Sequence, residues 1–251
     1  MLSLMLLIMI RPGAAFIAAP FFNATQIPVQ LRVTLALAIG LPALSLVGDI
    51  LPPDGLLSVM GLVMVMTEII LGLAIGFTLQ IAYSSSLLAG ELISSGMGLS
   101  FAAAVDPTSG QSNPVIANFI SVLATLLLLA SNGHLVLMQT LYESYRAMPP
   151  GQAWLGFGQI DALVGFGGAL FSMGFAIALP IIASITLVQI LLGIVSRSAP
   201  QFNLFSVSLP ATTFLGILFM VLFLPSMASG IDDALERGLS QARALILAPV
   251  E

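Results

Sequence analysis

The chain has 251 residues, of which 59% are hydrophobic and only 7% are charged, and its mean hydropathy is +1.12. Soluble domains carry about 25% charged residues, so this composition excludes an ordinary water-soluble globule and predicts a protein that faces lipid or other apolar chains. The formal net charge is -5 and all six basic residues are arginine, which argues against a nucleic-acid partner; the absence of cysteine excludes disulfides, thiolate catalysis and cysteine-ligated metals.

Six apolar segments are candidates for membrane helices, since a spanning helix needs about 20 mainly apolar residues. We therefore predict an all-α membrane protein with about six long apolar helical segments, some of them kinked or hairpin-like. The first ten residues resemble a signal peptide in length but lack a basic start and a small-residue cleavage site, so we interpret them as part of a mature helix. The predicted segments are residues 1–22, 31–47, 56–83, 115–140, 162–195 and 204–229.

Two stretches near the middle and the end of the chain are more polar. Residues 145–161 contain two adjacent prolines, a glycine and the single tryptophan, Trp154, a combination typical of a loop at a membrane–water boundary. Residues 232–243 are polar enough to form the solvated end of a helix. We therefore expect an interfacial connection before the fifth segment and a solvated tail after the sixth.

Small residues recur at helical spacing in the third segment. Gly72 and Gly76 form a Gly-xxx-Gly pair, and small residues then occupy every fourth position, so that a helix would carry them as one narrow stripe. We favour close packing against another helix over the general abundance of small residues in membranes. A helix over residues 56–99 would be about 65 Å long, so we expect it to break, bend back or project from the bilayer. The stripe consists of Ala82, Ser86, Gly90, Ser94, Gly98 and Ala102.

The stretch over residues 86–114 is unusual for its position between two apolar segments. It is too rich in glycine, serine and acid for a lipid-facing helix, yet too apolar for a solvated loop. Irregular backbone at membrane depth is tolerated only where protein buries it or where it lines a water-filled cavity. This stretch therefore predicts a gate, a plug or a binding site.

Three acidic residues are candidates for chemistry at membrane depth. Glu68 lies in the middle of an apolar helix, where it could be an ion or proton site or could form a structural hydrogen bond with a neighbouring helix or subunit. We favour the structural bond, because no charged partner lies one helical turn away. Glu91 and Asp106 could act as a general acid and base or could cap local turns. We favour the caps, since nothing near them completes a catalytic set.

The remaining motifs argue against an enzyme. His134 is the only histidine, and one histidine without cysteine cannot build a metal site of the usual kind. The chain has no Gly-x-Ser-x-Gly elbow for nucleophilic catalysis, and the absence of lysine rules out the phosphate-binding loop of ATPases. We therefore expect no metal, no cofactor and no catalytic residues.

Short motifs recur along nearly the whole chain. They are Arg11, Pro20, Pro28, Arg32 and Pro210, together with residues 89–91, 96–101, 105–107, 113–114, 132–135, 178–180 and 197–205. Each motif is weak alone, but in their order and spacing they resemble the FliR family of flagellar biosynthetic proteins. One departure lies at the start, because family members usually have more residues before the equivalent of Arg11.

This resemblance implies a subunit of the type III export gate at the flagellar basal body in the bacterial inner membrane. One copy would join several FliP-like and FliQ-like subunits in a helical, pore-forming assembly, together with an FlhB-like switch protein. Residues 1–140 would form a FliP-like helical part, residues 141–161 an interfacial connection, and residues 162–251 a FliQ-like hairpin with a tail. The transported partners would be unfolded proteins.

The leading hypothesis is a non-enzymatic gate subunit whose residues 96–113 plug the closed channel. The resemblance makes the glycines of this stretch hinges and its phenylalanine a hydrophobic stopper. One rival function is the equivalent gate of a virulence injectisome. The other is a proton- or ion-coupled carrier that uses Glu68 and Glu91. The expected plug residues are Gly96, Met97, Gly98, Phe101, Asp106 and Pro107.

Overall fold

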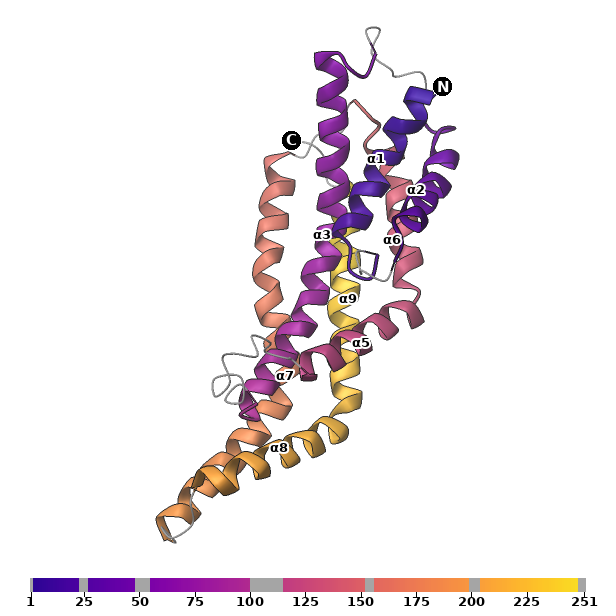
Figure 1. Cartoon of the computed structure of the whole chain (residues 1–251). Coiled ribbons are helices and arrows are strands. Elements are labelled where there is room, and N and C mark those ends of the chain that lie inside the picture. Colours follow the sequence, from indigo (N-terminus) through magenta and orange to yellow (C-terminus); the bar gives the residue numbers. More distant parts are fainter. Residues whose placement is uncertain are drawn as a thin grey trace. The chain divides into compact units, whose positions relative to one another are not determined.

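The computed structural model describes residues 2–22, 27–47, 55–99, 115–151, 156–198 and 204–247. This part of the chain is built from α-helices and contains no strand, which confirms the all-α prediction (Figure 1). Each of the six predicted apolar segments is helical. The helices are α1 (Leu2–Ala18), α2 (Val29–Ala43), α3 (Val59–Gly96), α5 (Val115–Ala130), α6 (Gly133–Ala147), α7 (Phe157–Ser198), α8 (Leu204–Leu222) and α9 (Leu224–Leu247).

Fewer helices can span a membrane than the sequence predicted. Within the described residues, only α3 and α7 are individually long and apolar enough, and two bent pairs, α5 with α6 and α8 with α9, raise the number to at most four. The helices α1 and α2 have only 17 and 15 residues, short of the roughly 20 that a span requires. Within the described residues, between two and four spans therefore pass the test of length and composition.

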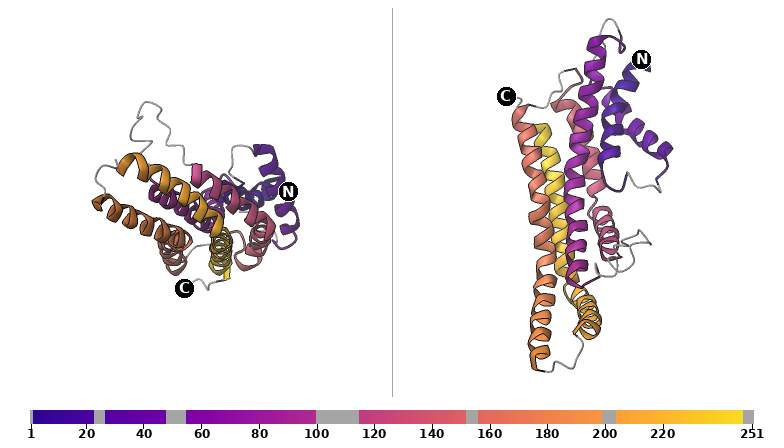
Figure 2. Two further views of the ribbon diagram at one scale, coloured as in Figure 1. Left: turned by 90° about the horizontal axis from the view of Figure 1, so that it is seen from below. Right: turned by 60° about the vertical axis from the view of Figure 1, so that its left-hand side comes forward.

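Two of the predicted segments bend sharply rather than continue as straight helices. The pair α5 and α6 meets at 62°, and the pair α8 and α9 meets at 67° (Figures 1 and 2). The first bend falls at Asn132, which has a left-handed φ of 58°, a conformation that asparagine tolerates better than most residues. The prediction that some of the apolar segments are kinked or hairpin-like is thus confirmed for residues 115–140 and 204–229.

Helix α3 remains one continuous helix of 38 residues (Figure 2). At 1.5 Å per residue it is about 57 Å long, almost twice the roughly 30 Å of a hydrocarbon core. The helix neither breaks nor bends back between Val59 and Gly96, where it ends. Of the three outcomes expected from its length, projection beyond the hydrocarbon layer is the one that fits an unbroken helix.

The predicted loop and tail contain more helix than expected. Helix α6 continues to Ala147 and α7 begins at Phe157, so only the middle of the predicted 145–161 connection is free to be a loop; Trp154 lies outside the described residues. Residues 232–243 lie within α9, which buries one face through Ala234 and Leu239. The tail is therefore amphipathic and packed, not a solvated helix end.

The helices divide into two compact units. The first contains residues 1–82, 128–169 and 235–251, and the second contains residues 83–127 and 170–234. In the first unit, α1, α2 and α6 share a small apolar core around Ile8, Ala43 and Tyr145. Several elements of each unit are thus far apart in the sequence, which allows polar groups on different helices to meet.

Candidate functional site

Arg11 of α1 and Glu68 of α3 form an ion pair in the interior of the first unit. The arginine Nε donates to Oε2 at 2.8 Å and its Nη2 donates to Oε1 at 2.7 Å, and both side chains have an exposed fraction of 0%. A planar guanidinium matches a carboxylate through two parallel hydrogen bonds, which is a strong geometry for such a pair. Each charge therefore meets an opposite charge instead of hydrocarbon.

The other donors of Arg11 reach helix α6 and the residue that follows it. Its Nη1 donates to the Ser144 hydroxyl at 2.8 Å, and its Nη2 also donates to the Met148 carbonyl at 2.9 Å. The guanidinium carbon lies 4.3 Å from the centre of the Tyr145 ring, within the range of a cation–π contact. One arginine thus ties α1, α3 and α6 together.

The environment of Glu68 favours the structural interpretation of this carboxylate. Its oxygens accept both arginine bonds, and no group of three or more His, Cys, Asp or Glu that could hold a metal occurs in the described part of the chain. Glu91, the second acid of the carrier hypothesis, is exposed on α3. The arrangement therefore offers no support for an ion-coupling site.

Arg11 was not predicted as the partner of Glu68. The two residues are 57 positions apart, beyond the reach of any argument from local helix spacing. A usable signal was nevertheless present, because each is the only charge in the middle of an apolar helix. Two lone opposite charges in apolar helices would each be expensive without a partner.

Because of Pro12, one backbone carbonyl of α1 lacks its usual donor, and the Tyr145 hydroxyl bonds this carbonyl instead. A proline inside a helix lacks the N–H that would bond the carbonyl four residues earlier, which here belongs to Ile8. The Tyr145 hydroxyl donates to the Ile8 carbonyl, and both residues are fully buried. The tyrosine therefore replaces the missing backbone donor and also stacks on the arginine.

The predicted packing glycines of the first unit lie where α3 touches α1. A Cβ atom at Gly72 would fall well inside 3.0 Å of the Arg11 carbonyl oxygen, and one at Gly76 would do the same at the Ala15 carbonyl oxygen. The two backbones approach so closely that neither position has room for a methyl group. The same close approach brings Arg11 within reach of Glu68, one turn before Gly72 on α3.

The stripe continues in the second unit, where α3 meets α5. A Cβ atom at Gly90 would lie 2.5 Å from the Ala117 Cα atom. Ser86 and Ser94 are buried. The Tyr83 hydroxyl donates to the Ser121 carbonyl at 3.0 Å and joins the same pair of helices.

Helix α3 ends in a defined turn at the first expected plug residues. The Leu99 N–H donates to the Ser94 carbonyl at 3.1 Å, and the Gly98 N–H donates to the Ser95 carbonyl at 3.0 Å. Gly98 has a φ of 80°. This pattern is a Schellman motif, in which glycine supplies the left-handed residue that ends the helix. The preceding Met97 is fully buried.

The expected plug residues fall on both sides of the described boundary. Gly96, Met97 and Gly98 form the end of α3, whereas Phe101, Asp106 and Pro107 lie outside the described residues. The chain returns at Val115, the first residue of α5.

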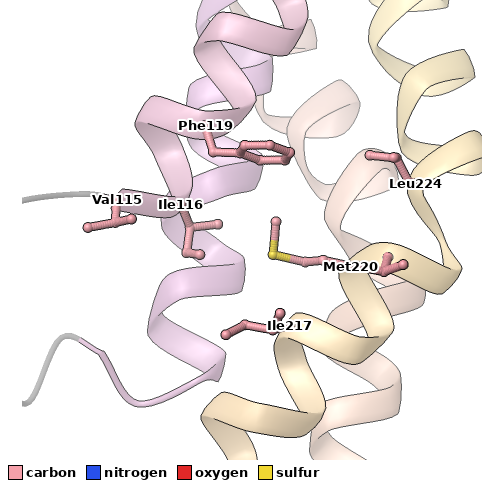
Figure 3. A pocket seen from close by; sticks show the side chains of 7 residues that line it. Val115, Ile116, Phe119, Ile217, Met220 and Leu224 are labelled. Atoms are coloured by element: carbon pink, nitrogen blue, oxygen red, sulfur yellow. The ribbon is translucent and has the colours of Figure 1, made fainter.

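An apolar cavity of about 340 Å³ lies where the chain returns (Figure 3). Figure 3 shows side chains of α5 and α8 pointing into the same space. The lining is purely apolar, so the cavity offers no group that would orient a charged substrate or cofactor. No sequence motif indicates this cavity. The lining residues are Val115, Ile116, Phe119, Ile217, Met220, Val221 and Leu224.

These features together define a helical membrane protein in which the buried polar groups around Arg11 and Glu68 join helices. The sequence matches the model of a family described as "Bacterial export proteins, family 1" over residues 2–238. Since this match covers nearly all of the chain, the protein belongs to that family of bacterial export proteins.

Similar proteins refine this assignment. The chain is 34% identical over 221 residues to the flagellar biosynthetic protein FliR of Escherichia coli strain K12, which covers 88% of this chain and 84% of that protein. It is 35% identical to FliR of Pectobacterium carotovorum subsp. carotovorum, with coverages of 86% and 82%. For FliR of Bacillus subtilis strain 168 the identity is 29%, with coverages of 86% and 84%. The predicted membership of the FliR family and role as a flagellar export-gate subunit are confirmed.

Proposed function

We propose that this export-gate subunit is non-enzymatic, lies in the bacterial inner membrane and helps to close the channel through which unfolded flagellar proteins pass. The family match over residues 2–238 carries the proposal. Two features of the chain support it. The buried polar groups of α1, α3 and α6 join these helices, and α3 ends in a capped turn at Gly98, directly before the proposed closing stretch.

The closing element is the stretch over residues 96–113. Gly98 ends α3 in a left-handed turn, and in the proposed role Phe101 is a hydrophobic stopper, with Asp106 and Pro107 as further plug residues. The fully buried Met97 supports this role, because it anchors the end of the helix that precedes the stretch. Such a segment can seal a pore with apolar side chains while its glycines allow it to move.

Ion leakage through the assembled complex tests the closing element. The assembled gate is reconstituted in vesicles, and ion flux is compared between the parent complex and one in which residues 98–105 are deleted. The deletion is expected to raise the leak. Unchanged leakage in a fully assembled deletion complex would remove the proposal. Phe101→Ala serves as a milder second variant if the deletion prevents assembly, and it is likewise expected to leak.

The proposed partners are FliP-like and FliQ-like subunits and an FlhB-like switch protein. Helix α7 supports this assignment, because only 22% of its most apolar window is buried within the chain. Phe171, Phe175, Leu179 and Leu187 are all more than half exposed. Residues 1–140 would provide the FliP-like part and residues 162–251 the FliQ-like part, joined by residues 141–161.

Copurification tests these partners. The chain is extracted in mild detergent from cells that carry the complete export system, and the associated proteins are identified by mass. FliP-like and FliQ-like proteins are expected in fixed proportion to the chain. Recovery of the chain alone, under conditions that keep the gate active for export, would contradict the proposed assembly.

A further inference from the structure

The last turn of α3 leaves two backbone carbonyls without partners from its own helix end. The final four carbonyls of any helix lack intrahelical donors, and here the Schellman motif supplies donors for the carbonyls of Ser94 and Ser95. Among the described residues, no backbone N–H donates to the carbonyls of Gly96 and Met97. In an apolar environment an unsatisfied carbonyl costs several kcal/mol, so the position of this turn depends on other donors.

Side chains from two other helices supply these donors. Gln189 of α7 donates through Nε2 to the Gly96 carbonyl at 2.9 Å. Thr212 and Thr213 of α8 bring their hydroxyls to 3.2 and 3.3 Å from the Met97 carbonyl. All four terminal carbonyls are thereby satisfied, two of them by residues more than 90 positions away in the sequence.

Helix α8 also holds this turn by shape. Gly216 lies one turn after Thr212 and leaves the space that Met97 fills, since a Cβ at Gly216 would lie 2.6 Å from two Met97 side-chain atoms. Leu209 lies one turn before Thr212, against Gly98. One face of α8 thus packs against the end of α3. It contributes the Leu209 side chain, the hydroxyls of Thr212 and Thr213, and the space at Gly216.

The Thr212 hydroxyl has other acceptors within its helix. It lies 2.8 Å from the Ser208 carbonyl and 3.2 Å from the Leu209 carbonyl, as expected for a helical threonine that bonds back to the preceding turn. One hydroxyl proton cannot serve three carbonyls fully. The neighbouring Thr213 hydroxyl therefore also serves as a donor to the Met97 carbonyl. A test must remove both hydroxyls together.

We infer that Gln189, Thr212 and Thr213 are positioning residues that fix the base of the channel-closing segment. They do not enter the channel; they hold the carbonyls from which residues 100–114 depart, so that the segment starts from one place and in one direction. This inference rests on the proposed closing role of that segment. It assigns to α7 and α8 a part in closure separate from that of the segment itself.

Ion leakage through the reconstituted gate tests the inference, with Thr212→Val combined with Thr213→Val as the principal variant. Valine keeps the shape of threonine but removes the hydroxyl. We expect the leak through the closed gate to rise about thirtyfold, because two hydrogen bonds worth roughly 1 kcal/mol each are lost and about 1.4 kcal/mol corresponds to a factor of ten. Gln189→Met removes the third donor at an exposed position, keeps a similar volume, and is expected to leak in the same direction.

Two further variants distinguish positioning from simple folding effects. Thr212→Ser with Thr213→Ser retains both hydroxyls and is expected to restore the tight gate. Thr186→Val on α7 is the matched control, because the Thr186 hydroxyl donates only locally, to the Ile182 carbonyl at 2.8 Å, and it should not leak. Leakage in the serine variant, or equal leakage in the Thr186 control, would overturn the inference.

The deletion of residues 98–105 separates this inference from the proposed function. If the deletion leaks while the double valine variant and Gln189→Met stay tight, the positioning inference is wrong and the closing role stands. If the deletion does not leak, the closing role fails and the inference fails with it. Leakage should be measured per assembled complex, with subunit content checked for each variant.

Discussion

Arg11 and Glu68 meet through two hydrogen bonds of 2.8 and 2.7 Å between side chains that are both fully buried. A pair of this kind is costly to desolvate, and its geometry must be good for the attraction to compensate. Here Ser144 and the Met148 carbonyl take further donors of the guanidinium. The pair and its neighbours therefore hold α1, α3 and α6 together.

Breaking this pair from one side should destabilise the protein strongly. Arg11→Met would leave the Glu68 carboxylate buried without its partner, and the expected loss in the free energy of unfolding is about 3 to 5 kcal/mol. Arg11→Met combined with Glu68→Leu removes both charges and should recover most of the loss. Thermal unfolding of the detergent-solubilised chain measures both.

Arg146→Met provides the control for the ion pair. Arg146 is exposed on α6 and its guanidinium carbon lies 5.9 Å from the centre of the Tyr142 ring, so we expect a change of about 1 kcal/mol or less. A double variant as unstable as Arg11→Met alone would show that the lost packing of the arginine stem, and not the unpaired carboxylate, causes the damage.

The pairing of Tyr145 with Pro12 predicts a non-additive result. Tyr145→Phe leaves the buried Ile8 carbonyl without a donor and should cost about 1 to 3 kcal/mol. In a Pro12→Ala background the backbone N–H at position 12 can bond this carbonyl, so the same tyrosine substitution should cost much less. Chemical unfolding of the four proteins of this double-mutant cycle gives the coupling energy.

Tyr142→Phe is a matched control for this cycle. The Tyr142 ring packs against the same core, while its hydroxyl has no hydrogen bond within the described part of the chain. Its loss should be small and independent of the residue at position 12. Additive effects of Tyr145→Phe and Pro12→Ala would refute the proposed replacement of the backbone donor.

The helices and the presence of kinks were predictable from the sequence, whereas the positions of the bends were not. Long apolar runs must form helices at membrane depth, because only internal hydrogen bonds satisfy the backbone there. Proline positions do not predict where these helices end. Helices α1, α7 and α8 each continue through a proline, namely Pro12, Pro180 and Pro210. Neighbouring groups such as the Tyr145 hydroxyl can satisfy the carbonyl that a proline frees, so the helix continues.

Some contacts of the site were likewise predictable from the sequence, and others were not. The small-residue spacing pointed to Gly72 and Gly76 because a stripe is a property of one helix and can be read locally. The partners of Glu68 and of the Met97 carbonyl lie on other helices, more than 50 positions away. Finding them requires the rotation and register of two packed helices, which a single sequence does not contain.

The close approach of α3 to α1 predicts a strong position effect among glycines. Gly72→Ala would push a methyl group into the Arg11 backbone, which cannot move without displacing α1, and should cost about 1 to 3 kcal/mol. Gly13→Ala in α1 is the control, since nothing lies within 4 Å of its Cβ position, and it should be neutral or slightly stabilising. Thermal unfolding of both variants measures this difference in stability. Equal effects at the two positions would contradict the packed interface.

The Schellman turn at the end of α3 predicts opposite results for two glycines that are two residues apart. Gly98→Ala would place a side chain at a φ of 80°, which costs about 1 to 2 kcal/mol for an L-residue, and its Cβ would lie 2.7 Å from a Leu209 methyl group. Gly96→Ala lies in regular helix, where its Cβ would meet only Ile185 at 3.9 Å. Alanine should therefore stabilise the helix there by up to about 1 kcal/mol. Unfolding temperatures of the two variants would thus shift in opposite directions, and a fall of equal size in both would contradict the assignment of Gly98 as the left-handed residue that ends a regular helix.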